Sequence, residues 1–446
     1  MPQGRGPAKM RAFMSKPPVD SPFPAGVPAL EAVVENPATL RELLAIKPYV
    51  RFWTGRVCNS LAAQIQSIAL AWEIYEVARH SVSVNRAAFA VGMLGLAQFL
   101  PMIALTLFAG HAADRYDRRR IMIASLCLQF ATAAVFAVMV WSGLKAVWPI
   151  YGVAAVFGAG RAFYQPSATA LVPTLVERRM IPRAIVFNSA GNQGATILGP
   201  AIGGLIVAAS PLAAFAVSAV LFLGAIASLS AMTSPPRAEP ASTASRWTLI
   251  AEGLRYVWTT KIVLGAITLD LFAVLLGGAT ALLPVYARDI LHVGPQGFGV
   301  LRAAPSAGAL LTGFVLAARP LKSKVGLKMF LGVGLFGAST VVFALSRSMV
   351  VSAVALATLG AGDMISVFVR QSLVQIVTPN AMRGRVAAVS GLFIGASNEL
   401  GEFESGTLAR LLGPIGSALF GGCGAIAVTL AWAFLFPALR KADKLE

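Results

Sequence analysis

Apolar segments long enough to cross a membrane recur from about residue 50 to residue 437, with only short polar breaks between them. A membrane-spanning helix needs roughly 20 such residues, and a chain inside a bilayer must satisfy its backbone internally. The chain is 13% charged, about half the share found in soluble domains. It is therefore predicted to be an all-α integral membrane protein with twelve spans, near residues 50–76, 86–112, 121–143, 147–171, 184–208, 211–233, 261–288, 297–318, 327–346, 349–373, 385–409 and 413–437.

The longest break, 234–260, divides these spans into two sets of six. Residues 247–258 within it have an amphipathic pattern suited to the membrane surface. A weak repeat at constant offset relates Gly158–Arg161 to Gly360–Asp363, which favours two pseudosymmetric six-helix bundles. The expected domains are an N-terminal tail (1–48, with a possible surface helix over 28–46), a bundle (49–233), a linker (234–260), a bundle (261–438) and a C-terminal tail (439–446).

The distribution of basic residues predicts an orientation. Most of the 37 Lys and Arg residues fall in the tails and in alternate loops, and only six fall in the other loops: Arg79, Arg86, Lys145, Arg288, Arg347 and Arg410. Cytoplasmic loops are enriched in Lys and Arg, so both termini are expected in the cytoplasm, with the protein in a bacterial inner membrane. The net charge of +18 has the same explanation. Since the basic residues form no stripe on a soluble domain, nucleic-acid binding is not expected.

The stretch 110–120, between spans 2 and 3, is densely charged: Gly-His-Ala-Ala-Asp-Arg-Tyr-Asp-Arg-Arg-Arg. Its Gly110, Asp114, Arg115, Arg118 and Arg119 resemble the signature loop of the major facilitator superfamily. Residues 95–101 and 188–204 resemble its branch of enterobactin-type siderophore exporters and macrolide-efflux-like proteins. The resemblance implies a gating contact between Asp114 and the start of span 11, near 383–385, where a carboxylate meets a helix N-terminus. The alternative is a solvated loop that only sets topology.

Span 5 contains Gly199-Pro200-Ala201-Ile202-Gly203-Gly204. This sequence resembles the motif that marks proton-coupled exporters in the superfamily. Glycines allow helices to approach closely, and proline bends a helix. Ordinary helix packing explains the same residues, so the motif favours export without requiring it.

Charged residues inside spans are costly and indicate function by default. The repeat relates Arg161 of span 4 to Asp363 of span 10, and in the resembled fold spans 1, 4, 7 and 10 line the central cavity. Arg161 and Asp363 are therefore expected to face each other, as a coupling pair or as a static ion pair. Asp270 of span 7 is a candidate for proton or substrate binding, or a partner of Arg302. Arg370 is expected to snorkel harmlessly.

Span 11 carries three glutamates, of which Glu399 and Glu402 share a helix face. They are candidates for proton or substrate binding, whereas Glu404 is expected to face the periplasm. In span 1, Gln64 and Trp72 are candidates to contact a substrate, although they could equally pack against neighbouring helices.

Together these features predict a secondary active transporter that moves a small organic compound by alternating access, preferably as proton-coupled export of a siderophore- or drug-like substrate. The expected partners are the substrate, protons and membrane lipids, and the protein is expected to be a monomer with no cofactor or metal. A flippase for lysophospholipid or a lipid-linked compound is the alternative within this fold. A membrane-embedded enzyme is a weaker alternative, because the scattered His and Cys residues supply no catalytic cluster.

Overall fold

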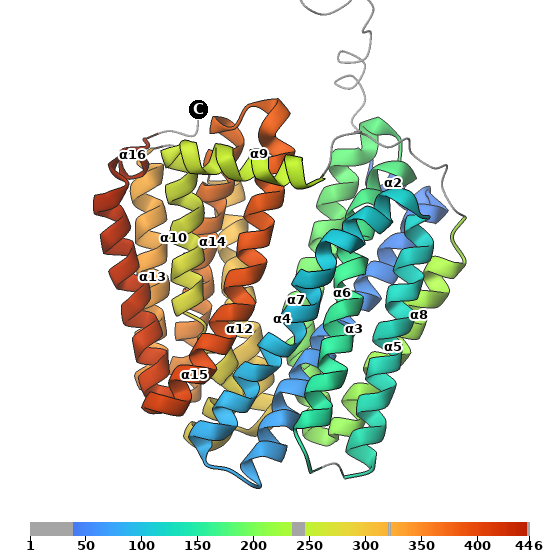
Figure 1. Ribbon diagram of the computed structural model, residues 1–446, viewed down its shortest axis with the longest axis vertical. Coiled ribbons are helices and arrows are strands. Elements are labelled where there is room, and N and C mark those ends of the chain that lie inside the picture. Colours follow the sequence, from blue (N-terminus) through green and yellow to red (C-terminus); the bar gives the residue numbers. More distant parts are fainter. Residues whose placement is uncertain (1–38, 144, 234–245, 320, 322, 444–446) are drawn as a thin grey trace, which may run out of the picture.

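The structure is a computed structural model that describes residues 39–143, 145–233, 246–319, 321 and 323–443. Within these ranges every regular element is a helix. Two groups of helices stand side by side, one formed by the first half of the chain and one by the second (Figure 1). The expected tail 1–48 and the linker 234–260 lie partly outside the described residues, and so does the end of the C-terminal tail.

The first group is a bundle of long helices preceded by a short surface helix. α3 packs against α7 and α8, and α6 packs against α4 and α5. The bounds are α2 (Leu40–Ala45), α3 (Lys47–Arg79), α4 (Val84–Arg115), α5 (Arg118–Trp141), α6 (Trp148–Leu175), η1 (Arg178–Met180), α7 (Ile181–Ala209) and α8 (Pro211–Ser230).

The second group follows α9, a helix that fills the amphipathic stretch of the linker. In this group α14 packs against α12 and α13, and α15 packs against α10 and α13. The bounds are α9 (Arg246–Thr259), α10 (Lys261–Leu276), η2 (Ala279–Leu282), α11 (Leu283–Val285), η3 (Tyr286–Ile290), α12 (Gly294–Ala318), α13 (Val325–Leu345), α14 (Met349–Val377), α15 (Asn380–Leu435) and α16 (Pro437–Arg440).

One predicted span is interrupted in the structure, and the last two predicted spans meet at a kink. The predicted span 261–288 is interrupted after α10 at Gly277 and Gly278, and it continues through η2 and α11 into η3, a π-helical turn. Glycines weaken a helix interior, which explains where the interruption lies. The predicted spans 385–409 and 413–437 correspond to the two arms of α15, which a sharp kink separates at Gly413, with φ 77° and ψ 164°. Only glycine adopts such a conformation readily.

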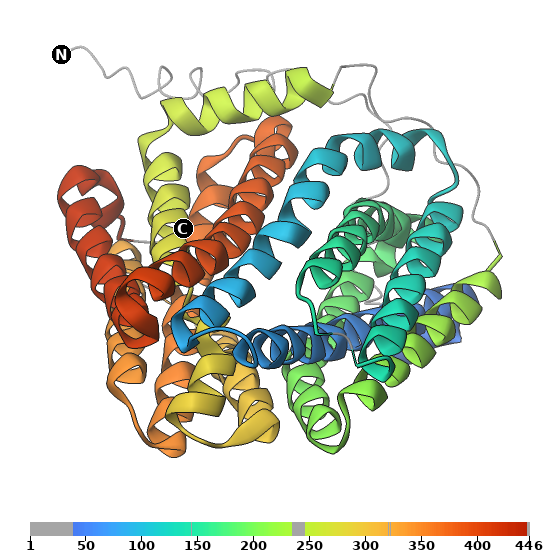
Figure 2. The ribbon, with the colours of Figure 1, turned by 60° about the horizontal axis from the view of Figure 1, so that its bottom comes forward.

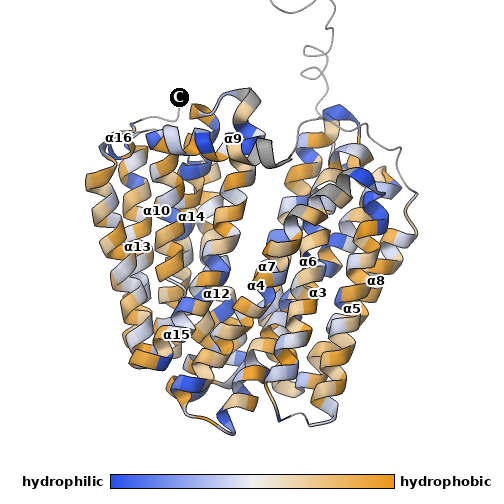
Figure 3. Ribbon diagram, in the orientation of Figure 1, coloured by the Kyte–Doolittle hydropathy of each residue, from blue (hydrophilic) through white to orange (hydrophobic). Residues whose placement is uncertain are grey.

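Most of the helical residues are hydrophobic (Figure 3), and many large apolar side chains, such as Leu205, Phe314 and Leu331, are exposed. Among the described residues, nine helical stretches are long and apolar enough to cross a membrane, and the last of them, 382–435, contains the Gly413 break. The protein is therefore a multi-pass helical membrane protein. The count of twelve crossings stays a prediction.

The two groups meet at one end of the molecule only. We call the end that carries α2, α9 and α16 the basic end, and the opposite end, with the turns at 80–83 and 346–348, the far end (Figure 1). One hydrophobic core includes the far-end parts of α3 and α4 together with residues of the second group. At the basic end the first group has its own core, around Tyr49 and Phe222, and the second has another, around Val263 and Val386. The halves are therefore separate at the basic end (Figure 1) and joined at the far end, where α4 of the first half runs alongside α15 of the second (Figure 2).

Candidate transport site

A polar cavity of about 150 Å³ lies where the two halves meet, near the middle of the long helices. Helices of both halves line it, because α3, α4 and α6 contribute from one side and η2, α12 and α15 from the other. Its polar side chains are Gln64, Ser67, Gln98, Arg161, Thr280, Arg302, Glu399 and Glu402. A cavity shared by both halves would be remodelled by any rocking of one half against the other.

Arg161 of α6 forms an ion pair across the two halves. Its Nη1 atom lies 3.7 Å from Oε1 of Glu399 on α15 and donates a 3.4 Å hydrogen bond to Oε1 of Gln98. The expected partner, Asp363, is not the residue that Arg161 meets. The repeat places Arg161 and Asp363 on equivalent helices, but the acid that reaches Arg161 comes from α15.

Glu402 lies one turn further along α15 and joins the second ion pair of the cavity. Its Oε1 atom is 3.5 Å from Nη2 of Arg302 and accepts a 3.5 Å hydrogen bond from the Thr280 hydroxyl in η2. Helix α4 approaches this residue closely, since a Cβ on Gly95 would lie 3.2 Å from the Cβ of Glu402. The cavity thus holds two arginine–glutamate pairs, and both glutamates come from one face of α15.

Asp270 belongs to a separate ion pair inside the second half. Its Oδ2 atom lies 3.3 Å from Nη2 of Arg370, so neither the expected pairing of Asp270 with Arg302 nor the snorkelling of Arg370 is observed. Asp270 is 5% exposed and Arg370 3%. Asp363 lies within electrostatic range of both, on the same helix as Arg370. This buried Asp270–Arg370 pair lies away from the central cavity.

The aromatic residue of the cavity is Phe298 rather than Trp72. Trp72 is 7% exposed, and its ring packs at 6.0 Å against Phe298 of α12. Phe298 lines the cavity, whereas Trp72 is not a lining residue and contacts only the Phe298 ring there. Gln64 does line the cavity, as the sequence suggested. Glu404 is half-buried and lies outside the cavity lining, with a 3.3 Å hydrogen bond from the Ser405 hydroxyl.

A larger cavity, of about 650 Å³, lies between α4, α6 and α15 on the basic-end side of the polar cavity. Most of its lining is apolar, including Phe99 and Leu392, and its polar exceptions are Thr106, Gln165 and Thr169. We call this larger cavity the vestibule. In this conformation a solute could reach the vestibule from the basic end, whereas the shared core closes the far end.

Glycines permit the close crossings that hold the far end together. A Cβ on Gly204 of α7 would lie 2.6 Å from the Cα of Gly299 on α12, and one on Gly92 of α4 would lie 2.8 Å from the Cα of Gly406 on α15. Within the first half, a Cβ on Gly199 would lie 2.5 Å from the Cβ of Gln64. Helix contacts in a bilayer depend on close packing, since lipid is as apolar as the side chains.

The charged stretch 110–120 forms the end of α4 and the start of α5 rather than a long loop. Asp117 caps α5 by accepting a 2.9 Å hydrogen bond from the backbone N–H of Arg119. Arg118 donates to the carbonyl of Ala170 at 2.8 Å, and Arg119 donates to that of Leu229 at 2.8 Å. These arginines thus bind the carbonyl ends of α6 and α8. The side chain of Asp114 lies outside the described part of the structure, so its gating contact stays a prediction.

Five cavity residues were not predicted to lie there: Ser67, Gln98, Thr280, Phe298 and Arg302. Arg302 could have been found from its charge inside a span. The others carry no signal of their own, because single uncharged polar or aromatic side chains are common in membrane helices.

The match to a known family covers both halves of the chain. Residues 42–446 match the model of a family described as transmembrane secretion effectors, within the major facilitator superfamily. The chain belongs to this family. Its members are transporters, so the protein carries a solute and is not an enzyme.

Two relatives of the secretion effector family illustrate the similarity. The chain is 29% identical to the multidrug efflux pump Tap of Mycolicibacterium fortuitum, over 74% of this chain and 83% of Tap. It is 24% identical to the enterobactin exporter EntS of Citrobacter koseri, over 80% of this chain and 85% of EntS.

A solved structure shows the same fold. A transporter of the POT family, crystallised with 5-aminolevulinic acid, superimposes with a TM-score of 0.68 at 13% identity, over 92% of this chain and 99% of that one.

Proposed function

We propose that this protein exports a small, amphiphilic organic compound from the bacterial cytoplasm and drives the export with protons. The observation that carries the proposal is the arrangement of two arginine–glutamate pairs at the inner end of an apolar vestibule. The efflux activities named for Tap and EntS support the outward direction.

The basic end is assigned to the cytoplasm. It carries the turns with Arg178, Arg179, Lys324, Arg383 and Arg385, and cytoplasmic loops are enriched in such residues. We propose an inner (plasma) membrane location with both termini in the cytoplasm, an orientation that the same distribution supports. The conformation described is then open toward the cytoplasm, which is the side from which an exporter loads.

The charges of the cavity support proton coupling. When Glu399 and Glu402 are ionised, Arg161 and Arg302 are neutralised and the cavity has no net charge. An ionised Glu399 or Glu402 can instead pair with a basic group of a solute that enters from the basic end. A proton that binds this glutamate from the far-end side removes the attraction and releases the solute, so proton and solute occupy the site in turn and move in opposite directions. Entry of one proton releases about 2.3 kcal/mol per 100 mV of membrane potential.

A transport assay in proteoliposomes tests the proposal. An imposed pH gradient should drive uptake or release of at least one member of a panel of siderophores, drugs and lysophospholipids. Glu399→Gln should abolish the dependence on the gradient, whereas Glu404→Gln, on the same helix but outside the cavity lining, should retain it. A transport rate that does not depend on the pH gradient would refute proton coupling. Selective transport of lysophospholipid would favour the flippase alternative.

A further inference from the structure

One arginine of the first half lies inside a predicted span without an acidic partner. Arg56 of α3 has no ion pair and no side-chain hydrogen bond with any residue that the structure describes. Other arginines deep in the helices each meet an acid: Arg161 meets Glu399, Arg302 meets Glu402 and Arg370 meets Asp270. Because a charge inside a span is costly and indicates function by default, Arg56 is a candidate to bind a group from outside the protein.

The ionisable groups near Arg56 are phenols rather than carboxylates. Of the described residues, Tyr49 and Tyr164 lie within electrostatic range of its guanidinium. A phenol is uncharged at neutral pH. No described carboxylate therefore neutralises Arg56, and this part of α3 carries a positive charge.

Tyr164 of α6 supplies a second hydrogen-bond donor beside Arg56. Tyr164 is 3% exposed, and its hydroxyl has no hydrogen-bond partner among the described residues. The Tyr49 hydroxyl differs, because it donates to the carbonyl of Ala184 at 2.9 Å. A buried polar group without a partner is costly. The guanidinium of Arg56 and the hydroxyl of Tyr164 are thus two donors that lack an acceptor.

Arg56 lies on the face of α3 that leads to the central cavity. Ser60 and Gln64 follow it at intervals of four residues and Ser67 follows after eleven, and these spacings place all four residues on one side of the helix. Gln64 and Ser67 line the cavity. At about 1.5 Å per residue, Arg56 is about 14 Å from the start of α3 and about 16 Å short of Ser67.

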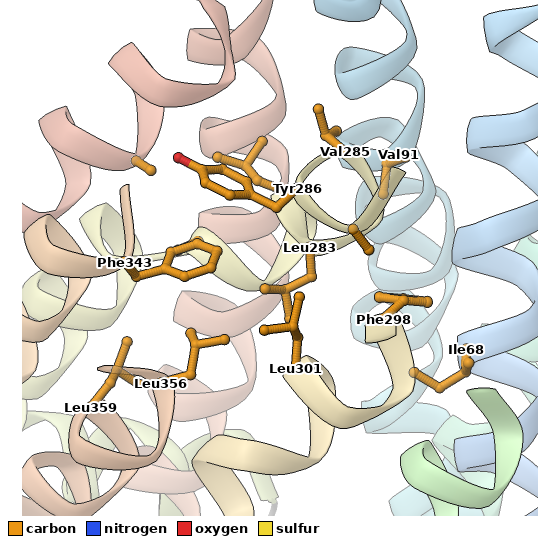
Figure 4. Packing of buried hydrophobic residues seen from close by; sticks show 14 of the residues in the cluster. Ile68, Val91, Leu283, Val285, Tyr286, Phe298, Leu301, Phe343, Leu356 and Leu359 are labelled. Atoms are coloured by element: carbon orange, nitrogen blue, oxygen red, sulfur yellow. The ribbon is translucent and has the colours of Figure 1, made fainter. Parts of the chain in front are cut away.

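The path from the basic end follows the same parts of α3 and α6. Gln165, the residue after Tyr164, lines the vestibule. Beyond it, Ile68 and Phe298 line the central cavity and belong to the core that closes the far end (Figure 4). A solute that moves from the basic end to the glutamates therefore moves along the α3 face that carries Arg56. A cation without a counter-charge beside such a path raises the local concentration of anions.

We propose that Arg56 and Tyr164 bind an oxyanion of the transported solute, such as a carboxylate, sulfonate or phosphate group. This site rests on the proposed export and narrows its substrate class to amphiphiles that carry an acidic group as well as the basic group that pairs with Glu399 or Glu402. Guanidinium donors match the oxygen atoms of an oxyanion in geometry and charge. The apolar part of the solute then contacts the vestibule.

Binding of two matched fluorescent probes to the purified full-length protein tests the site. The dansyl amide of taurine carries a sulfonate, and the mono-dansyl amide of ethylenediamine carries an ammonium group. Arg56→Gln should weaken binding of the sulfonate probe by about tenfold, the loss expected for a hydrogen bond to a charged group. The same variant should leave binding of the ammonium probe unchanged. Arg56→Lys keeps the charge and should retain most of the affinity for the sulfonate probe.

Two further variants separate this site from a general effect of charge or folding. Tyr164→Phe removes only the hydroxyl and should weaken the sulfonate probe by about threefold, so it tests the site even if Arg56→Gln does not fold. Arg51→Gln is the matched control, because it removes the same side chain from the same helix. Arg51 is exposed and donates to the carbonyl of Ala231, and its variant should bind both probes as the parent does.

A lipid headgroup is the other source of an oxyanion, and nanodiscs of two compositions distinguish it from a solute. The ratio of parent to Arg56→Gln affinity for the sulfonate probe should be the same in phosphatidylcholine and phosphatidylglycerol discs. A ratio that falls to one only in phosphatidylglycerol would overturn the assignment to a solute, because a lipid phosphate would then fill the site. Equal affinities of parent and Arg56→Gln in phosphatidylcholine would overturn the site itself. Because binding requires no pH gradient, failure of this site is distinguishable from failure of the proposed export.

Discussion

The close approach of Gly204 in α7 to Gly299 in α12 offers a way to change the equilibrium between the conformations closed and open at the far end. In Gly204→Ala, the new methyl group would lie 2.6 Å from the Cα of Gly299 and 2.7 Å from the carbonyl oxygen of Pro295. Both contacts are with backbone atoms, so no side chain can rotate away. Overpacking of this kind costs about 1–3 kcal/mol. This free-energy cost destabilises the conformation in which the far end is closed, because the two helices touch at that end.

The expected result is a shift toward the conformation open at the far end. A differential cost of 1–3 kcal/mol changes the ratio of two conformations by about 5- to 150-fold. Ser67 lines the central cavity, and Ser67→Cys in a background with Cys58, Cys127 and Cys423 replaced by serine gives one reporter thiol. Its labelling by a membrane-impermeant maleimide applied from the far-end side should rise accordingly, up to the limit set by full opening. The gain in helix propensity on replacing glycine by alanine, about 0.5–1 kcal/mol, is common to both conformations and cancels.

Gly194→Ala is the matched control, since it makes the same change on the same helix with no atom within 4 Å of the new methyl group. It should label at the parent rate. Equal labelling of the Gly204→Ala and Gly194→Ala variants would refute the reasoning, because it would mean that close packing at the crossing does not hold the far end shut.

Further predictions concern the two ionic sites. Glu402→Gln and Arg302→Gln should each slow substrate counterflow by about tenfold, equivalent to 1.4 kcal/mol, and the double variant should be no slower, since one pair is broken in all three. Asp270→Ala should lower the stability of the detergent-solubilised protein by about 3–5 kcal/mol because it leaves the Arg370 charge buried without its closest partner, and a thermal melt measures this. An unchanged melting temperature would contradict the placement of that pair.

Sequence predicted the helices well and their polar contacts poorly. The positions of the helices followed from apolar length, because a membrane fixes how long each span must be. The interruption after α10 was missed, since two glycines in an apolar run are also compatible with a continuous membrane helix.

The partners of the charged residues were the least predictable part. The repeat placed Arg161 and Asp363 on equivalent helices, but which acid reaches Arg161 depends on the rotation of α15 about its axis. That rotation is set by the glycine contacts Gly92–Gly406 and Gly95–Glu402, which span more than 300 residues of sequence. Glu399 and Glu402 were found because their spacing alone places them on one helix face.

Distances between spin labels on the two halves test the account most directly. One pair, at Arg178 and Ser323, reports on the basic end, and another, at Ser142 and Arg347, reports on the far end; all four residues are exposed. As substrate or pH shifts the equilibrium, we predict that the first distance shortens while the second lengthens. Distances that both stay fixed while transport proceeds, or that change in the same direction, would contradict a mechanism in which two halves rock about the central ion pairs.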